Sequence, residues 1–209
     1  NQELMKCIDI GTYDGACIRS CLERGAFVDI RIKGSITPLY GAAAHGDFEL
    51  VKYILSLKPD VNFIDDSGNS ILMNIAGSKK LEVAQLLIDH GADVNYNSGG
   101  ENVMTAAARS NNLDMAKLMI KNGFNVKEYG GAALGLAAGN QNVQIVKLLI
   151  ENGADVNYYK RYMPQKTPLD VAIEVGNKEI IEILKSAGAM SAPEVEIESD
   201  RDEQVIEHR

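Results

Sequence analysis

The chain has 209 residues, 45% of them hydrophobic and 24% charged, and it carries a formal net charge of -8. This composition predicts a globular protein that is long enough for one continuous core but not obviously for two independent folds. No apolar run approaches the roughly 18 residues that cross a bilayer, and the acidic balance disfavours nucleic acid, whose binding needs clustered Lys and Arg. We therefore expect a protein partner, and the charge favours a basic one.

Residues 1–34 are predicted to form an N-terminal unit, which holds all three cysteines of the chain. Cys17 and Cys21 are four residues apart, so they would lie side by side on one helix face with parallel Cβ vectors, a geometry that disfavours a disulfide. We expect Cys7, Cys17 and Cys21 to be buried thiols that pack as small hydrophobes, with a redox or ligand role as the alternative.

The chain begins with Asn1 rather than Met. Removal of a leader, or origin from a longer chain whose catalytic domain lies elsewhere, therefore stays open. The compartment is not determined by the sequence. The cytoplasm is favoured, and an exported or periplasmic location is the alternative if a leader preceded Asn1.

Residues 35–67 show most completely a unit that recurs along the chain. Thr37 and Pro38 open a short helix, because a Thr hydroxyl caps the first turn and Pro lacks only an N–H that would be unpaired there. Gly46 is predicted to end this helix in the left-handed conformation, and a second helix over 48–57 carries apolar residues at helical spacing. An extended excursion follows. Each unit is therefore predicted to be a helix, a turn, a helix and a hairpin.

This unit returns at a spacing of roughly 33 residues, and such a fixed period indicates stacked units that cannot bury their apolar faces alone. Copies of its hairpin start, Gly-Ala-Asp-Val-Asn in the clearest cases, begin at Gly25, Lys58, Gly91, Gly123, Gly153 and Gly188. The predicted units after the first are 35–67, 68–99, 100–129, 130–163 and 164–190.

These residues resemble the ankyrin repeat family from residue 1 to about residue 190. Thr37–Leu39 and Thr167–Leu169 match the family's helix-opening motif, and Gly-Ala-Asp-Val-Asn matches its hairpin start. The resemblance implies an all-α solenoid of about six repeats with short β-hairpin tips, in which 1–34 is the capping repeat. In the middle repeats the motif's Thr and its turn Gly are replaced, respectively, by Ser70, Asn102 and Ala132 and by Lys79, Asn111 and Gln141.

The last segment, 191–209, is predicted to be an acidic tail, because seven Asp and Glu residues outweigh two Arg residues there. We favour a solvated, partly disordered extension. A docked capping segment is the alternative, suggested by the apolar residues Val195, Ile197, Val205 and Ile206.

The sequence offers few groups for catalysis. The three histidines, His45, His90 and His208, lack the spacing of a metal site, and no phosphate-binding loop or Ser or Cys nucleophile motif is present. Gly99–Gly100 and Gly130–Gly131 are interpreted as hairpin turns rather than phosphate cradles. We therefore expect no catalytic residue, no cofactor, no metal and no enzyme activity.

By the resemblance, a partner would bind on the concave surface formed by the hairpin tips and the exposed side of the first helices. Small residues at most of these helix positions predict a shallow groove. Candidate contacts on this surface are His45, Arg109, Tyr129, Lys166 and Glu174.

The longest hairpin tip, residues 158–166, combines aromatic and basic residues. Tyr and Arg supply much of the binding energy at protein interfaces. We therefore hypothesise that Tyr159, Arg161 and Tyr162, with Lys160 beside them, anchor a partner. The alternative is that the first two tyrosines of the tip pack against the preceding hairpin while its basic residues are solvated.

The leading functional hypothesis is a non-catalytic protein–protein interaction module, favoured as a monomer, that neither binds nucleic acid nor inserts into a membrane. One alternative is an inhibitor or immunity-type protein that blocks a basic enzyme or toxin. Another is an ankyrin fragment of a larger multidomain protein. Partner binding that weakens strongly in salt would favour the inhibitor, because screening acts on exposed charges.

Overall fold

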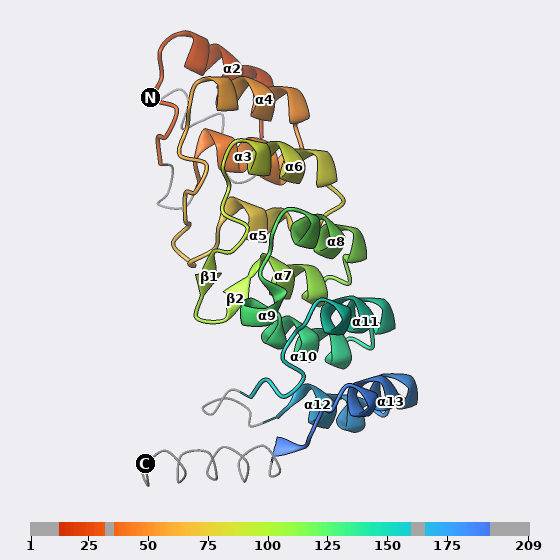
Figure 1. The fold of residues 1–209 in the computed structure, drawn as a ribbon. Helices are drawn as coiled ribbons and strands as arrows, with labels where there is room; N and C mark the ends of the chain where they lie inside the picture. Colours follow the sequence, from red (N-terminus) through yellow and green to blue (C-terminus); the bar gives the residue numbers. More distant parts are fainter. Residues whose placement is uncertain (1–12, 32–35, 160–165, 193–209) are drawn as a thin grey trace, which may run out of the picture.

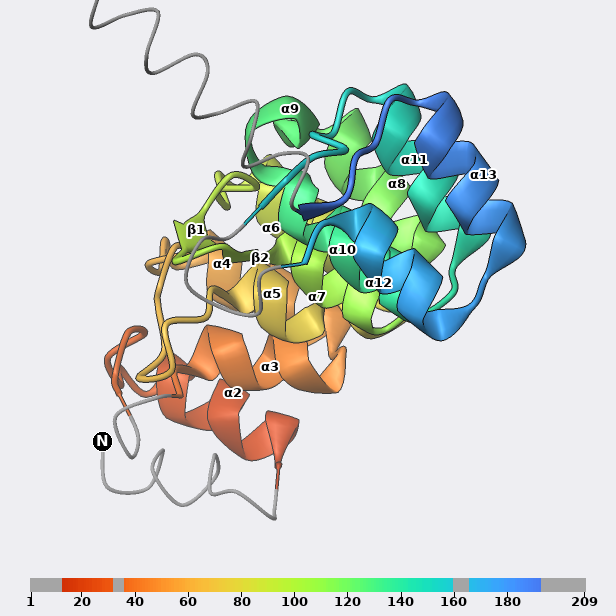
Figure 2. The same ribbon diagram turned by 90° about the horizontal axis from the view of Figure 1, so that it is seen from below.

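The computed structural model describes residues 13–31, 36–159 and 166–192. Its elements are α2 (Gly15–Glu23), α3 (Pro38–His45), α4 (Phe48–Ser56), α5 (Ile71–Ile75), α6 (Leu81–Asp89), β1 (Asn97–Ser98), β2 (Glu101–Asn102), α7 (Val103–Arg109), α8 (Leu113–Lys121), α9 (Val126–Tyr129), α10 (Gly131–Gly139), α11 (Val143–Glu151), α12 (Pro168–Val175) and α13 (Lys178–Ser186). The helices stack as pairs from α2 at one end to α12 and α13 at the other (Figure 1). Viewed along the stack, α3, α5, α7 and α12 lie in one row beside the row of α8, α11 and α13 (Figure 2).

Strand pairing among the described residues includes one short hairpin and an isolated bridge. β1 pairs antiparallel with β2 around Gly99 and Gly100, whose φ angles of 61° and 97° suit glycine. The bridge joins Ile64 to Ser70. The predicted all-α repeat solenoid with short hairpin tips is confirmed, and Gly99–Gly100 is the hairpin turn that we expected.

Side chains cap most of the first helices. The Thr37 hydroxyl accepts a hydrogen bond from the Tyr40 N–H at 3.2 Å, as predicted. Ser70 and Asn102, which replace the family's Thr, also cap their helices, since the N–H groups of Met73 and Thr105 donate to them. A polar side chain at this position is therefore sufficient to start the helix.

The turns between paired helices contain left-handed residues. Gly46 has φ 78°, as predicted. Asn111 and Gln141 take the same conformation, with φ angles of 53° and 57°, although Gln adopts it with more strain than Asn does. Lys79 does not adopt the left-handed conformation. The turn geometry is therefore kept in two of the three repeats that lack the glycine, because the packing of both helices requires it.

The hydrophobic core runs through the whole stack as one cluster. The second helices contribute long side chains that are fully buried, namely Ile54, Leu87, Met119, Leu149 and Leu184. Successive first helices pack directly on one another. Before α12, a fully buried alanine stands at the same position of each repeat, in the last turn of the first helix or, for α5, at its C-cap, namely Ala43, Ala76, Ala108 and Ala138. These small side chains allow neighbouring helices to approach closely.

A ladder of asparagine side chains links successive repeats at the hairpin edge. Asn62 accepts from the Asp93 N–H at 2.8 Å and donates to the Gly91 carbonyl at 3.0 Å. Asn95 bonds the next repeat in the same way, through Asn125 N–H at 2.8 Å and Gly123 carbonyl at 3.1 Å. Asn157 makes the same two bonds to the last repeat, because its side chain accepts from the Met190 N–H and donates to the Gly188 carbonyl.

The joint between α8 and α10 departs from this pattern. Lys127 stands where the other repeats have Asn95 or Asn157, and a short helix, α9, replaces the hairpin. The interpretation of Gly130–Gly131 as a hairpin turn is therefore wrong: Gly130 has φ -82° and Gly131 is the first residue of α10. The physical reason is length, because the shortened excursion leaves room for one helical turn but not for two strands.

The cysteine expectation is wrong for one residue. Cys17, half-buried on α2, forms a disulfide. Cys21 is a buried thiol, as expected, so the two do not bond each other. Cys7 lies outside the described residues. Cys21 belongs to the buried core, whereas Cys17 is only partly buried beside it.

Replacing Asn95 with Ala should lower the free energy of unfolding by about 1–2 kcal/mol, because two hydrogen bonds between repeats are lost. Urea denaturation would measure the change. Asn152→Ala is the matched control, since that side chain bonds the Leu148 carbonyl within its own helix. The control should change the stability by less than about 0.5 kcal/mol. Equal effects of the two substitutions would contradict a role of the ladder in joining repeats.

Candidate functional site

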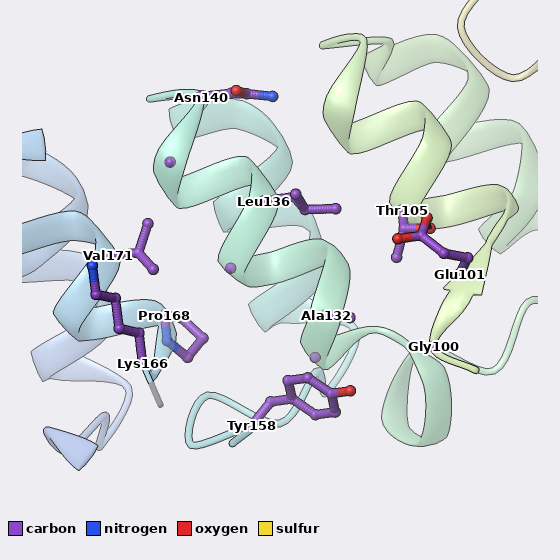
Figure 3. A pocket seen from close by; sticks show the side chains of 13 residues that line it. Gly100, Glu101, Thr105, Ala132, Leu136, Asn140, Tyr158, Lys166, Pro168 and Val171 are labelled. Carbon is purple, nitrogen blue, oxygen red and sulfur yellow. Dashed lines mark hydrogen bonds between the residues drawn. The ribbon is translucent and has the colours of Figure 1, made fainter. Parts of the chain in front are cut away.

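The concave face is hollowed over α10, between α7 and α12 (Figure 3). The hollow has a volume of about 460 Å³ and is open along one side. Its lining comes from three first helices and from both ends of the long hairpin tip. We call it the α10 groove, and it is lined by Gly100, Glu101, Thr105, Gly131, Ala132, Gly135, Leu136, Gly139, Asn140, Tyr158, Lys166, Pro168 and Val171.

Glycines at every fourth residue form the floor of the α10 groove, but only one of them is open to it. A Cβ at Gly131 would lie 2.5 Å from the Cβ of Tyr158, and one at Gly139 would lie 3.3 Å from a methyl of Val171. A Cβ at Gly135 would meet no atom within 4 Å. The groove therefore has open space beside Gly135, where the helix backbone is partly accessible.

Two ion pairs form the rims of the groove. Glu101 accepts two hydrogen bonds from Arg109 at 2.8 and 2.9 Å on the α7 side. Lys166 donates to Glu174 at 2.6 Å on the α12 side. These side chains are between 41% and 61% exposed, so solvent screens the pairs and they add little stability. Their effect is to leave the groove close to neutral.

A second, more polar hollow of about 250 Å³ continues along the concave face toward α5. Glu101 and Arg109 line it as well, so their ion pair divides the two hollows. Asn74 on α5 faces this second hollow and bonds the Asp65 carboxylate at 3.3 Å. The concave surface therefore has two neighbouring hollows, separated by the Glu101–Arg109 ion pair. Small residues on the first helices predicted such a shallow groove.

The structure brings three of the predicted contact residues together, because Arg109, Lys166 and Glu174 all lie at the rims of the α10 groove. The sequence did not indicate that each is paired with another side chain of the same surface. The partners lie eight residues apart in both pairs, so each pair links the end of a hairpin to the last turn of the following helix.

His45 lies toward the other end of the stack, where its side chain packs against another residue of this protein. Its ring stacks on Tyr13 with the centroids 3.9 Å apart and the planes 11° from parallel. Tyr13 also donates to Asp47 at 3.0 Å, and burial together with this carboxylate raises the pKa of Tyr13. His45 therefore helps to attach the first repeat to the second.

The predicted hairpin residues are placed only in part. Tyr129 is half-buried, and its ring lies 6.4 Å from that of Phe124. Tyr159 is half-buried as well. The three remaining residues of the predicted anchor, Lys160, Arg161 and Tyr162, lie outside the described residues. Their role in binding stays a prediction.

Sequence reasoning missed Gly135, Leu136 and the position of Tyr158. Tyr158 packs on Gly131 of α10, and its ring closes one end of the groove (Figure 3). Leu136 projects from α10 into the hollow (Figure 3). The spacing of glycines 131, 135 and 139 was a visible signal, since every fourth residue lies on one helix face.

The described part of the chain contains no cluster of three or more His, Cys, Asp or Glu side chains that could hold a metal ion. None of the helices in the described ranges combines the length and hydropathy that a membrane span needs. The chemistry that the α10 groove offers is contact: apolar surface, an accessible helix backbone and charged side chains at the rims.

Gly135→Ala should raise the free energy of unfolding by about 0.5–1 kcal/mol, because Ala favours the helix and its methyl enters open space. Gly131→Ala, the same change in the same helix, should lower it, since the new Cβ would collide with Tyr158. Denaturant titration of both variants measures the two changes. Changes of the same sign would show that the floor of the groove is packed differently.

Comparison with known proteins identifies the repeat. The family model for ankyrin repeats in three copies matches residues 39–129 and 125–193. The chain is 30% identical over 83 residues to human ankyrin repeat and SOCS box protein 16, over 40% of this chain and 18% of that protein. It is 43% identical over 60 residues to the probable 26S proteasome regulatory subunit p28 of Saccharomyces cerevisiae, over 28% of this chain and 26% of that protein.

A third relative is the serine/threonine-protein kinase VIK of Arabidopsis thaliana, 33% identical over 90 residues. The match covers 43% of this chain and 20% of the kinase. The chain thus spans about a quarter or less of the length of these relatives. Because the family model covers more than half of the sequence, the chain belongs to the ankyrin repeat family, whose repeats form a general and typically non-catalytic protein–protein interaction module.

Proposed function

We propose that this protein is a non-catalytic binding module that holds a segment of a protein partner in the α10 groove. The observation that carries this proposal is the hollow of about 460 Å³ on the concave face, over Gly135 of α10, where an added Cβ would meet no atom within 4 Å. A general interaction module needs a surface that differs from its repeated framework. The α10 groove is such a surface.

The shape of the groove favours an apolar side chain as the central contact. Leu136 and Val171 supply apolar surface, and Gly135 leaves space for the incoming group. Interfaces gain most of their affinity from a few large side chains that fill such pockets, with polar groups around them. We infer that a partner places an aromatic or aliphatic residue over Gly135.

The residues at the two ends of the long hairpin tip also favour the α10 groove as the binding face. Tyr158 and Lys166, at the two ends of this tip, both line the groove. The predicted anchors Tyr159, Arg161 and Tyr162 belong to the segment between them in sequence. A partner segment in the groove would therefore contact Tyr158 and Lys166.

A photo-crosslinking amino acid in place of Leu136 tests the binding face. In an extract of the native source, it should capture a partner, whereas the same group at Gln144 on α11 should capture little. Gly135→Leu should then weaken binding of the purified partner at least tenfold, about 1.4 kcal/mol, because the new side chain fills the groove. Isothermal titration calorimetry measures this affinity.

Gln144→Leu is the matched control and should leave the affinity unchanged, since Gln144 is exposed on a second helix. Unchanged affinity of Gly135→Leu, in a variant as stable as the parent, would refute the groove as the binding face. Capture from Gln144 rather than from Leu136 would have the same consequence.

The acidic charge of -8 motivates the alternative of an inhibitor that blocks a basic enzyme or toxin. The α10 groove itself is close to neutral, because its rim charges are paired. Binding in the groove should therefore weaken by less than about threefold when the salt rises from about 0.05 to 0.5 M. A much steeper loss of affinity would favour the basic partner.

A further inference from the structure

The last described repeat exposes an apolar side chain at a position that is buried in the four repeats before it whose first helices are described. Ile173 on α12 stands where α3, α5, α7 and α10 carry their fully buried alanines. Ile173 is 52% exposed. Its neighbour Ala172 is fully buried like the residues before those alanines, so the core within this last repeat is complete. The exposure of Ile173 therefore comes from the absence of a following element among the described residues.

In the second helix of the last repeat, charged residues stand at two positions that are apolar in the preceding second helices. Lys185 on α13 stands where the preceding second helices carry apolar residues, namely Leu55, Ile88, Ile120 and Ile150. Lys178 likewise replaces an apolar residue at the start of this helix. Apolar surface nevertheless continues onto α13, because Ile181 is only partly buried, whereas the residues at its position in the preceding second helices are fully buried, namely Val51, Ala84, Ala116 and Val146. The end face therefore combines apolar side chains with two lysines, which suits an occupant that carries both apolar and acidic residues.

The chain itself leaves the described structure beside this face. The Ala192 N–H donates to the Asp170 carboxylate at 3.0 Å, and the Thr167 hydroxyl donates to the Met190 carbonyl at 2.9 Å. Asp170 and Ile173 are three residues apart on α12, so they are neighbours on one side of that helix. Ala192, the last described residue, is therefore bonded to a residue about one helical turn from Ile173.

We propose that residues 193–209 of this chain cover Ile173 and close the end of the stack. This segment contains the apolar residues Val195, Ile197, Val205 and Ile206 among acidic residues. Its carboxylates complement Lys178 and Lys185, which are exposed on α13. Its seventeen residues are long enough to span the single helical turn, roughly 5 Å, that separates Asp170 from Ile173. This inference is independent of the α10 groove, which lies on another face.

A double-mutant cycle in the full chain tests the proposal. Ile173→Ser is combined with each of two tail variants, Val195→Ser/Ile197→Ser and Val205→Ser/Ile206→Ser, and the equilibrium constant for unfolding is measured in urea. At least one combination should be non-additive by about fivefold or more, because contacting residues are coupled. Since Ile173 lies at the surface of α12, these variants are expected to fold.

Leu57→Ser is the matched control, because Leu57 is another exposed large side chain but lies on the second repeat. Its combination with either tail variant should be additive to within about twofold. Additivity of Ile173→Ser with both tail variants would overturn the proposal. A melting temperature that rises with protein concentration, and stops doing so in Ile173→Ser, would also overturn it, because the occupant would then be a second copy of the chain.

Discussion

Every repeat in this stack depends on its neighbours to bury the apolar side of its first helix. The alanine at the same position of α3, α5, α7 and α10 loses all its exposure when the following helix packs against it. A single repeat could not exclude water from this surface, so stability belongs to the array. The asparagine ladder adds directional bonds at the hairpin edge. Apolar contact thus sets the distance between repeats, and hydrogen bonds fix their relative position.

The α10 groove lies where this regular pattern is interrupted. Lys127 replaces the ladder asparagine, α9 replaces a hairpin, and α10 begins at a glycine with no side-chain cap. Tyr158 then packs on Gly131, and this contact supports the joint from the next repeat. Residues that do not serve the framework are available for other contacts. The proposed binding face therefore coincides with a joint that departs from the regular hairpin pattern.

Much of the architecture was predictable because its signals are local. Thr37 caps a helix through its own hydroxyl, and Gly46 reverses the chain through its own φ angle. The prediction was wrong at Gly130–Gly131, where the same residue type serves a helix start once the excursion is shortened. It was also wrong for Cys17, because a disulfide depends on a partner from elsewhere in the chain.

The sequence by itself determined the repeat, the order of helices and the surface on which small residues gather, since helical spacing and caps act over a few residues. Only the tertiary structure decided which of these small residues faces open space. Gly131, Gly135 and Gly139 are equivalent in spacing, yet the first meets Tyr158, the last meets Val171 and Gly135 meets nothing. Those contacts come from residues about one repeat away, and their positions depend on how the repeats stack.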